Sequence, residues 1–405
     1  MTFRRRDNIM CHVFCVLTGV KTQGVLFRRK VMSETTKKKE KGFKAFLKRK
    51  DIEISLSRYG IDALGAMAQG LFCSLLIGTI INTIGTQFNI GFLNEPIVTL
   101  GKENPIPYTV GGLASLMSGP AMAVAIASAL KCPPLVLFSM ITVGFSANAL
   151  GGAGGPLAVL FIAVIASEFG KAISKETKVD ILVTPLVTIG IGVFLSWLIA
   201  PLLGTAAMYV GNVIMWATEQ QPFIMGILVS VLVGIALTLP ISSAAICAAL
   251  QLTGLAGGAA VAGCSAQMVG FAIASFKENK WGGLVSQGIG TSMLQMGNIV
   301  KNPRIWLAPT LASAITGPIA TCVFQLKMNG APISSGMGTC GLVGQIGVYT
   351  GWVNDIAAGT KSAITTMDWV GLILISLVLP AILSLIFDRI FRKIGWVKDG
   401  DMKLN

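Results

Sequence analysis

Long apolar runs separated by short basic segments dominate the chain. Eight of these runs are about 17 to 26 residues long, enough for a helix to cross roughly 30 Å of hydrocarbon. They predict spans near residues 62–85, 109–130, 133–150, 155–171, 181–203, 222–240, 303–327 and 366–391. The pattern predicts an all-α polytopic membrane protein with about 8–10 transmembrane helices plus re-entrant hairpins.

The re-entrant hairpins are predicted from apolar segments that are too rich in glycine for plain helices. They cover residues 146–156, 239–271, 282–298 and 330–347, and the second is expected to be interrupted at Gly254, Gly257 and Gly258. Lipid cannot satisfy the N–H and C=O groups of irregular backbone, so such segments must pack within protein or line a watery cavity. We therefore expect re-entrant hairpins or broken helices around a cavity.

One four-residue sequence, PISS, occurs twice in these segments, at residues 240–243 and 332–335. Each copy is followed by small residues and then a glutamine. Duplicated broken segments often frame a transporter site, although four residues can also match by chance in so biased a composition.

Composition and charge support a membrane location. The 405 residues are 53% hydrophobic and 12% charged, with a mean hydropathy of +0.73, which excludes an ordinary water-soluble fold. Residues 1–60 hold 16 of the 32 basic residues against 5 acids, a net charge of +11 out of +14. The run KKKEKGFKAFLKRK precedes the first span, where basic residues set topology and bind anionic lipid. No recognition motif supports nucleic-acid binding.

The remaining basic residues suggest orientation. Lysines and arginines flank the predicted spans at Lys171, Lys175, Lys178, Lys277, Lys280, Lys301, Arg304, Arg389, Arg392 and Lys393. Cytoplasmic ends carry such residues, so we expect a multi-pass protein of the bacterial plasma membrane with both termini in the cytoplasm.

Three parts are expected. Residues 1–60 form a basic extension and amphipathic helix, 61–395 a transmembrane domain, and 396–405 a cytoplasmic tail. Residues 1–31 resemble a signal peptide without a cleavage site, and are either native or an upstream extension of a chain that starts at Met32.

The sequence points to no metal, cofactor or catalytic site. Its eight cysteines include no CxxC pair, and His12 is the only histidine. No phosphate-binding G-x-x-x-x-G-K-[ST] motif is present, so transport would depend on an ion gradient or a partner protein.

Polar residues within the broken segments are the candidate solute site. Glu95, beside Asn94, lies between two apolar segments, where a carboxylate can accept hydrogen bonds from vicinal hydroxyls, carry a proton, or simply face water. The uncharged candidates are Asn148, Gln251, Ser265, Gln267, Asn298, Ser334, Ser335 and Gln345. Such residues suit a neutral polyhydroxylated solute, although singly each could also join helices.

The runs SGPAMAVAIASALKCPPL, LPISSAAICAALQLTG and NGAPISSGMGTCGLVGQIG resemble the membrane subunit IIC of the bacterial sugar phosphotransferase system, over residues 50–395. More narrowly, they resemble a divergent branch labelled predicted membrane protein or toxin regulator. The resemblance implies a homodimer that binds a carbohydrate between spanning and re-entrant helices, and a cytoplasmic IIB protein that phosphorylates it on entry. Because neither a IIA nor a IIB domain is fused to this chain, phosphorylation would depend on separate IIB and IIA proteins. Sugar subunits of this family often bind substrate with a glutamate and a histidine. The resemblance implies that Glu95, in Asn94–Pro96, is the counterpart of the glutamate, whereas the membrane region has no histidine.

Two alternatives stay open beside a sugar-translocating IIC subunit. One is a membrane sensor or regulator that signals through the basic amino-terminal helix. The other is a gradient-driven transporter of another polar metabolite, in which Glu95 carries the coupling proton.

Overall fold

The computed structural model describes residues 43–101 and 105–404. The chain forms two compact units, Met1–Lys50 and Asp51–Asn405. In the first unit the described part is helix α3 (Phe43–Arg49), where Arg49 and Lys50 place their charged groups 5.5 and 5.9 Å from the Phe46 ring centre. Residues 1–31, with His12, Cys11 and Cys15, lie outside the described residues.

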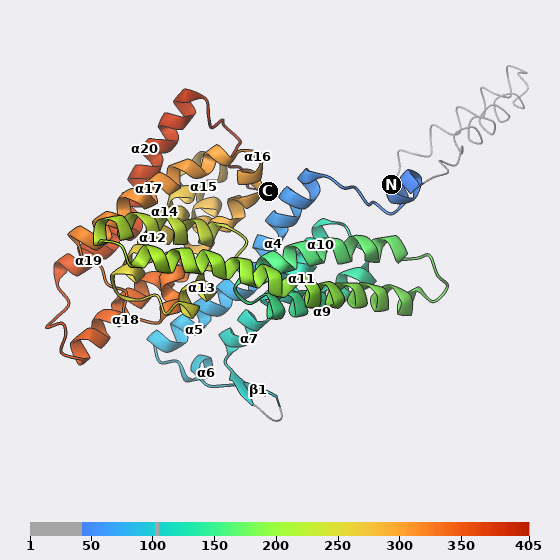
Figure 1. Ribbon diagram of the computed structural model, residues 1–405, viewed down its shortest axis with the longest axis horizontal. Helices are drawn as coiled ribbons and strands as arrows, with labels where there is room; N and C mark the ends of the chain where they lie inside the picture. The colour runs from blue at the N-terminus through green and yellow to red at the C-terminus, as the bar shows by residue number, and fades with distance from the viewer. Residues whose placement is uncertain (1–42, 102–104, 405) are drawn as a thin grey trace, which may run out of the picture. The chain divides into compact units, whose positions relative to one another are not determined.

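Among its described residues, the regular structure of the second unit is helical apart from one antiparallel pair of strands, β1 (Val98–Leu100) and β2 (Ile106–Tyr108), as Figure 1 shows. Its longer helices are α4 (Ala63–Leu71), α5 (Ile77–Gln87), α8 (Ser118–Ala129), α9 (Pro134–Gly151), α10 (Gly155–Ile173), α11 (Asp180–Thr218), α12 (Pro222–Thr238), α14 (Gly254–Ala274), α15 (Phe276–Val285), α17 (Leu307–Pro318), α18 (Val343–Ala357), α19 (Thr366–Ile373) and α20 (Leu379–Ile394).

Short helices and tight turns connect these elements. The short α-helices are α6 (Gly91–Asn94), α7 (Val110–Leu116), α13 (Ser243–Ala249) and α16 (Met296–Lys301). Wider π-type turns are η1 (Arg58–Asp62), η2 (Phe72–Leu76), η4 (Ser286–Gly290), η7 (Ile319–Val323) and η10 (Leu374–Val378). Tighter 3-10 turns are η3 (Gly152–Gly154), η5 (Ser292–Gln295), η6 (Pro303–Trp306), η8 (Pro332–Gly336) and η9 (Cys340–Leu342).

Six helical runs among the described residues are long and apolar enough to cross a membrane. They are Arg58–Gln87, Pro134–Ile173, Asp180–Thr218, Gly254–Ala274, Pro303–Val323 and Thr366–Ile394. The pair α7 and α8, bent by 47°, makes a seventh if it acts as one span. The second run contains α9 and α10, which pack against each other, and α12 has 17 residues. The prediction of an all-α polytopic membrane protein is confirmed.

Glycine breaks the helices at several predicted places. The 40-residue run Pro134–Ile173 turns back on itself at Gly152, whose φ of +51° is accessible to glycine but costly for other residues. Segments 282–298 and 330–347 are likewise divided into short turns and helices. The predicted interruption of residues 239–271 is partly wrong, because Gly254 begins α14 and both Gly257 and Gly258 lie inside it.

Helix α14 runs through the centre of the second unit, where its side chains are almost all buried. It packs against α12, α17 and α20. Contact is so close that a Cβ atom added at Gly258 would overlap the carbonyl oxygen of Leu326, and one at Gly263 that of Ser230. Gly258, which the sequence predicted as a helix break, therefore admits the backbone of Leu326, and Gly263 admits the backbone of α12, as small residues do within membranes.

The two PISS segments lie against each other at the start of α13 and in η8. The Ser243 hydroxyl donates to the Gly336 carbonyl at 2.7 Å, and the Ser335 hydroxyl donates to the Leu252 carbonyl at 2.6 Å. Gly254 and Met328 also exchange two backbone hydrogen bonds of 3.0 Å. The sequence echo thus corresponds to two broken segments in direct contact.

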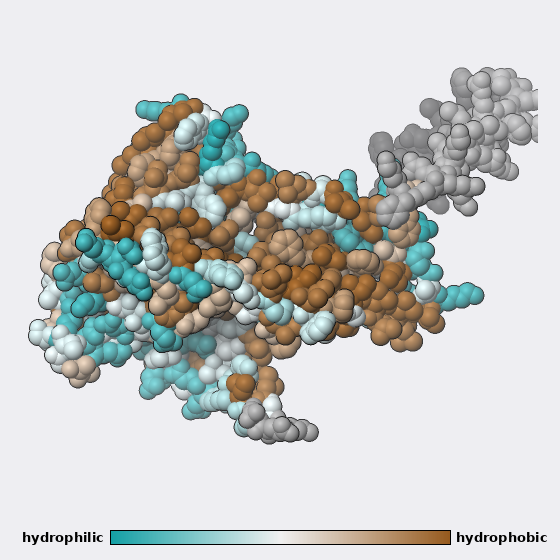
Figure 2. Space-filling view, viewed as in Figure 1, coloured by the Kyte–Doolittle hydropathy of each residue, from teal (hydrophilic) through white to brown (hydrophobic). Residues whose placement is uncertain are grey.

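Apolar side chains cover much of the outer surface, as the brown areas of Figure 2 show. They include Leu186, Trp197 and Leu202 on α11, the span with the smallest buried share. A hydrocarbon environment would make such exposure favourable, because lipid replaces the water that apolar groups avoid.

Candidate functional site

A cavity of about 600 Å³ lies along the beginning of the first span, Arg58–Gln87. The span presents Asp62, Gln69, Phe72 and Cys73 to it, and α16 adds Asn298. Binding sites for small molecules typically measure about 300–1,000 Å³, so the volume suits a small solute. The lining includes a carboxylate, two amides and an aromatic ring, together with Ser286, Lys403 and Leu404.

Helical periodicity explains why the polar residues of the first span line the cavity together. Asp62 and Gln69 are seven residues apart, close to two helical turns, and both are exposed. Between them Gly65 and Ala66 line the same cavity with minimal side chains. The spacing leaves room for a molecule that contacts both polar groups.

Two smaller cavities follow the same span. One of about 300 Å³ is lined by Ser115, Ser118 and Asn148, and one of about 50 Å³ by Ser243 and Thr291. Both are also lined by Leu71, Leu75, Pro156 and Ser242, and the smaller shares Phe72 with the first cavity. We call the three cavities together the cavity row.

Two of the predicted site residues line the cavity row. Asn148 donates its amide to the Ser118 hydroxyl at 3.3 Å in the 300 Å³ cavity. Asn298 lines the 600 Å³ cavity while its amide donates to Gln295 Oε1 at 2.8 Å and to the Lys403 carbonyl at 3.0 Å.

Four further predicted residues gather around the broken segment at 330–347. Gln345 donates its amide to the Ser265 hydroxyl at 3.2 Å, while its own Oε1 is buried without a hydrogen-bond partner. Ser334 and Ser335 are buried in η8, and a Cβ added at Gly347 would overlap Ser334. These residues form a second polar cluster outside the lining of the cavity row.

Gln267 has a helix-joining geometry. Its Oε1 accepts from Trp306 Nε1 at 2.9 Å, and its amide donates to the Thr310 hydroxyl at 3.2 Å, linking α14 to η6 and α17. Both polar atoms of its amide, Oε1 and Nε2, are therefore hydrogen-bonded within the protein. This is the helix-joining role that the sequence left open for such residues.

The remaining three predicted residues lie outside both groups. Glu95 is exposed immediately after α6, and Asn94 donates its amide to the Gly85 carbonyl at 2.8 Å. Gln251 is exposed with a φ of +50° and donates to the Ala248 carbonyl at 2.9 Å. None of the three lines the cavity row.

The sequence interpretation missed Asp62 and Gln69. Asp62 stands near Arg58 and the basic segment, where an acid is readily taken for an interfacial residue. The available signal was the pair of polar residues two turns apart on a helix otherwise rich in alanine and glycine.

The described residues contain no group of three or more His, Cys, Asp and Glu side chains placed to hold a metal ion. The six cysteines among them are free thiols.

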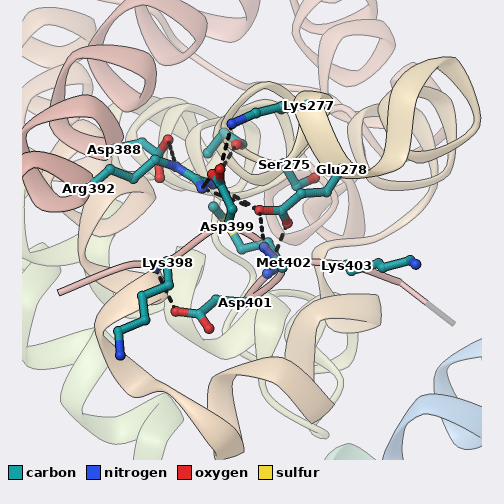
Figure 3. Close-up of polar contacts among 12 residues, drawn as sticks. Ser275, Lys277, Glu278, Asp388, Arg392, Lys398, Asp399, Asp401, Met402 and Lys403 are labelled. Atoms are coloured by element: carbon teal, nitrogen blue, oxygen red, sulfur yellow. Dashed lines mark hydrogen bonds and ion pairs between the residues drawn. The ribbon is translucent and has the colours of Figure 1, made fainter. Parts of the chain in front are cut away.

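An ionic cluster joins α15, α20 and the residues after α20, as Figure 3 shows. Arg392 contacts Glu278 Oε1 at 3.3 Å, Asp388 Oδ2 at 2.7 Å and Asp399 Oδ1 at 2.9 Å. Lys277 Nζ contacts Asp399 Oδ2 at 2.6 Å. The hydrogen bond from Lys277, with the charge of Arg392 nearby, holds the pKa of the Asp399 carboxyl below its usual value.

A pH titration of melting temperatures should reveal this ion pair. A carboxyl with a lowered pKa stabilises the folded state above its usual pKa of about 3.9, and the contribution is lost as the pH falls through the lowered value. We expect the difference in melting temperature between wild type and Asp399→Asn to be constant from pH 8 to 5 and to shrink only below about pH 4. Shrinkage between pH 8 and 6 would contradict the assigned pair.

Fold and cavities together define a class of protein, a multi-pass helical membrane protein with a solute-sized cavity that polar groups line in part. The family model for "phosphotransferase system, EIIC" matches residues 61–404. The chain belongs to this family and is a permease subunit of the phosphotransferase system. None of the curated proteins or solved structures compared with it matches.

Proposed function

We propose that this EIIC subunit binds and translocates a neutral carbohydrate or a similar polar solute through the cavity row. The observation that carries the proposal is the 600 Å³ cavity, in which Asp62, Gln69 and Asn298 offer hydrogen-bonding groups beside the Phe72 ring. A sugar that leaves water needs each hydroxyl paired, and a carboxylate can accept from two vicinal hydroxyls. Aromatic rings add an apolar surface for a sugar face.

The family membership supports further parts of the proposal. We place both termini and the Asp62 end of the first span in the cytoplasm, because Lys171, Lys277 and Lys301 mark that side. On the cytoplasmic side a separate IIB protein phosphorylates the solute on entry, and a IIA protein is a further separate partner. The protein acts as a homodimer, and the basic segment at 37–50 binds anionic lipid headgroups.

In the proposed function, Glu95 contacts the solute at the other end of the first span. The run Arg58–Gln87 separates it from Asp62, so the two carboxylates serve opposite faces of the membrane if that run crosses it. Asn94, Gln251 and the cluster of Ser265, Ser334, Ser335 and Gln345 would meet the solute after one helical group has moved against the other. Gln267 contributes indirectly, because its hydrogen bonds to Trp306 and Thr310 hold α14 in place.

Thermal stabilisation of the purified protein across sugars, sugar alcohols and other small metabolites tests the proposal. A bound solute raises the melting temperature by mass action, corresponding to about 2.7 kcal/mol at a hundred times its Kd. A hydrogen bond to a charged group contributes about 1.5–3 kcal/mol, so Asp62→Asn should weaken binding about tenfold or more. Gln69→Ala and Glu95→Gln are tested in parallel.

The matched control is Glu219→Gln, which neutralises an exposed carboxylate after α11 without touching the cavity row. It should keep the full response to the solute. A protein that responds to no carbohydrate, or whose response survives Asp62→Asn unchanged, would contradict the proposed site. A response to another metabolite alone would favour a gradient-driven transporter, and silence throughout would favour a sensor.

A further inference from the structure

Helix α20 ends at Gly395, which has a left-handed backbone conformation. The chain after it packs against the elements that contain Glu278, Gln295 and Asn298. Residues 398–404, which we call the strap, lie beside α15, η5 and α16 (Figure 3). Nothing in the composition of this segment predicts tight packing, because four of its seven residues are charged. The structure nevertheless buries Met402 almost completely.

One side of the strap is held by two neighbouring residues of α15. Glu278, whose side chain is 7% exposed, accepts the Gly400 N–H at Oε1 and the Met402 N–H at Oε2, both at 3.0 Å. Asn279 donates its amide to the Met402 carbonyl and accepts the Leu404 N–H, both at 2.8 Å. Backbone groups of Gly400, Met402 and Leu404 are thus paired with the side chains of Glu278 and Asn279.

The other side is held by buried amides. Gln295 donates to the Met402 carbonyl at 2.9 Å and to Gln287 Oε1 at 2.8 Å. Asn298 donates to the Lys403 carbonyl at 3.0 Å and to Gln295 Oε1 at 2.8 Å. Residues 399–402 of the strap form a turn. Buried amides are costly unless paired, so the groove is built to hold the backbone of this turn.

The same groove borders the 600 Å³ cavity. Lys403 and Leu404 form part of the cavity lining, together with Asn298, which holds the strap with its amide. Departure of the strap would therefore remove lining from the cavity. It would also free the amide hydrogens that Gln295 and Asn298 now donate to the Met402 and Lys403 carbonyls.

We propose that the strap is a gate of the cavity at its cytoplasmic end, and that solute exchange with that side requires the strap to leave the groove of Glu278, Asn279, Gln295 and Asn298. The inference rests on the proposed function for the identity of the solute and for the side of the membrane. The gating contact itself can be tested without any solute.

Cys73 provides a native reporter, because it is a free, exposed thiol that lines the same cavity. Purified protein is treated with a bulky, charged maleimide, and the labelling rate of the Cys73 peptide is followed by mass spectrometry. Cys322 in η7, an exposed thiol outside the cavity row, serves as the internal reference.

The strap is released in two ways. One variant lacks residues 398–405, and the other combines Glu278→Gln with Asn279→Ala, which keeps Met402 in the chain. We expect Cys73 to react about tenfold faster in both, equivalent to a change of about 1.4 kcal/mol in the opening equilibrium, with Cys322 unchanged. The matched control, Glu219→Gln with Asn354→Ala, alters an exposed acid and an exposed amide outside the groove.

Equal Cys73 rates in wild type and in the folded double variant would overturn the gate. An equal acceleration of Cys73 and Cys322 would also overturn it, since that result indicates general loosening. If no carbohydrate binds but Cys73 still responds to strap release, the gate stands and the proposed solute is wrong.

Discussion

Replacement of Gly263 by alanine is expected to prevent stable folding of the membrane unit. A Cβ at this position would overlap the Ser230 carbonyl of α12. The nearest atoms all belong to the Ser230 backbone, so no flexible side chain can move aside. Overpacking of a core typically costs about 1–3 kcal/mol, and a collision with backbone belongs at or above the upper end. We expect the purified variant in detergent to lose its monodisperse peak in size-exclusion chromatography, or its melting temperature to fall strongly.

Gly190→Ala is the matched control for this change. Gly190 lies inside α11, where an added Cβ meets nothing within 4 Å. Alanine is the better helix former by about 1 kcal/mol, so this variant should be as stable as wild type or more so. Similar behaviour of the Gly190 and Gly263 variants would contradict the central packing of α14 against α12.

Lys171→Met is expected to destabilise the protein by about 3–5 kcal/mol, because it leaves a carboxylate unpaired in a buried site. The Lys171 side chain is 2% exposed, and its Nζ lies 2.8 Å from Glu168 Oε2. The same ammonium donates to the carbonyls of Asp51 at 2.9 Å and Leu130 at 3.3 Å, so it ties three segments together. The melting temperature in detergent measures the loss.

A double variant separates the ion pair from the rest of this site. Lys171→Met with Glu168→Gln removes both charges, and we expect it to recover a large part of the lost stability, because no unpaired charge is then buried. Lys178→Met, at an exposed lysine nearby in the chain, should leave the melting temperature unchanged. A double variant as unstable as the single one would show that the carbonyl contacts, rather than Glu168, account for the effect.

The spans could be predicted from the sequence because their physical cause is local. A run of apolar residues long enough to cross hydrocarbon is visible without knowledge of its neighbours, and so is the break at Gly152. The role of Gly258 could not be predicted in this way. Whether a glycine breaks a helix or admits a neighbour depends on the Leu326 carbonyl, which is distant in the sequence.

The candidate site was predicted in part for the same reason. Asn148 and Asn298 line cavities as polar residues of broken segments should. Glu95 drew attention through its isolation in the sequence, yet it is exposed outside the cavity row. Asp62 was overlooked because its contribution depends on Gln69, two helical turns away, and on the small residues between them.

The most direct measurement of the central claim is a structure of the protein with the carbohydrate that stabilises it most. The account predicts density for the solute in the 600 Å³ cavity, within hydrogen-bonding distance of Asp62 and Gln69 and against the Phe72 ring. Soaking the Asp62→Asn protein at the same concentration should leave that density weaker. Density confined to another place, such as the cluster of Ser265 and Gln345, with an empty cavity beside Asp62, would contradict the account.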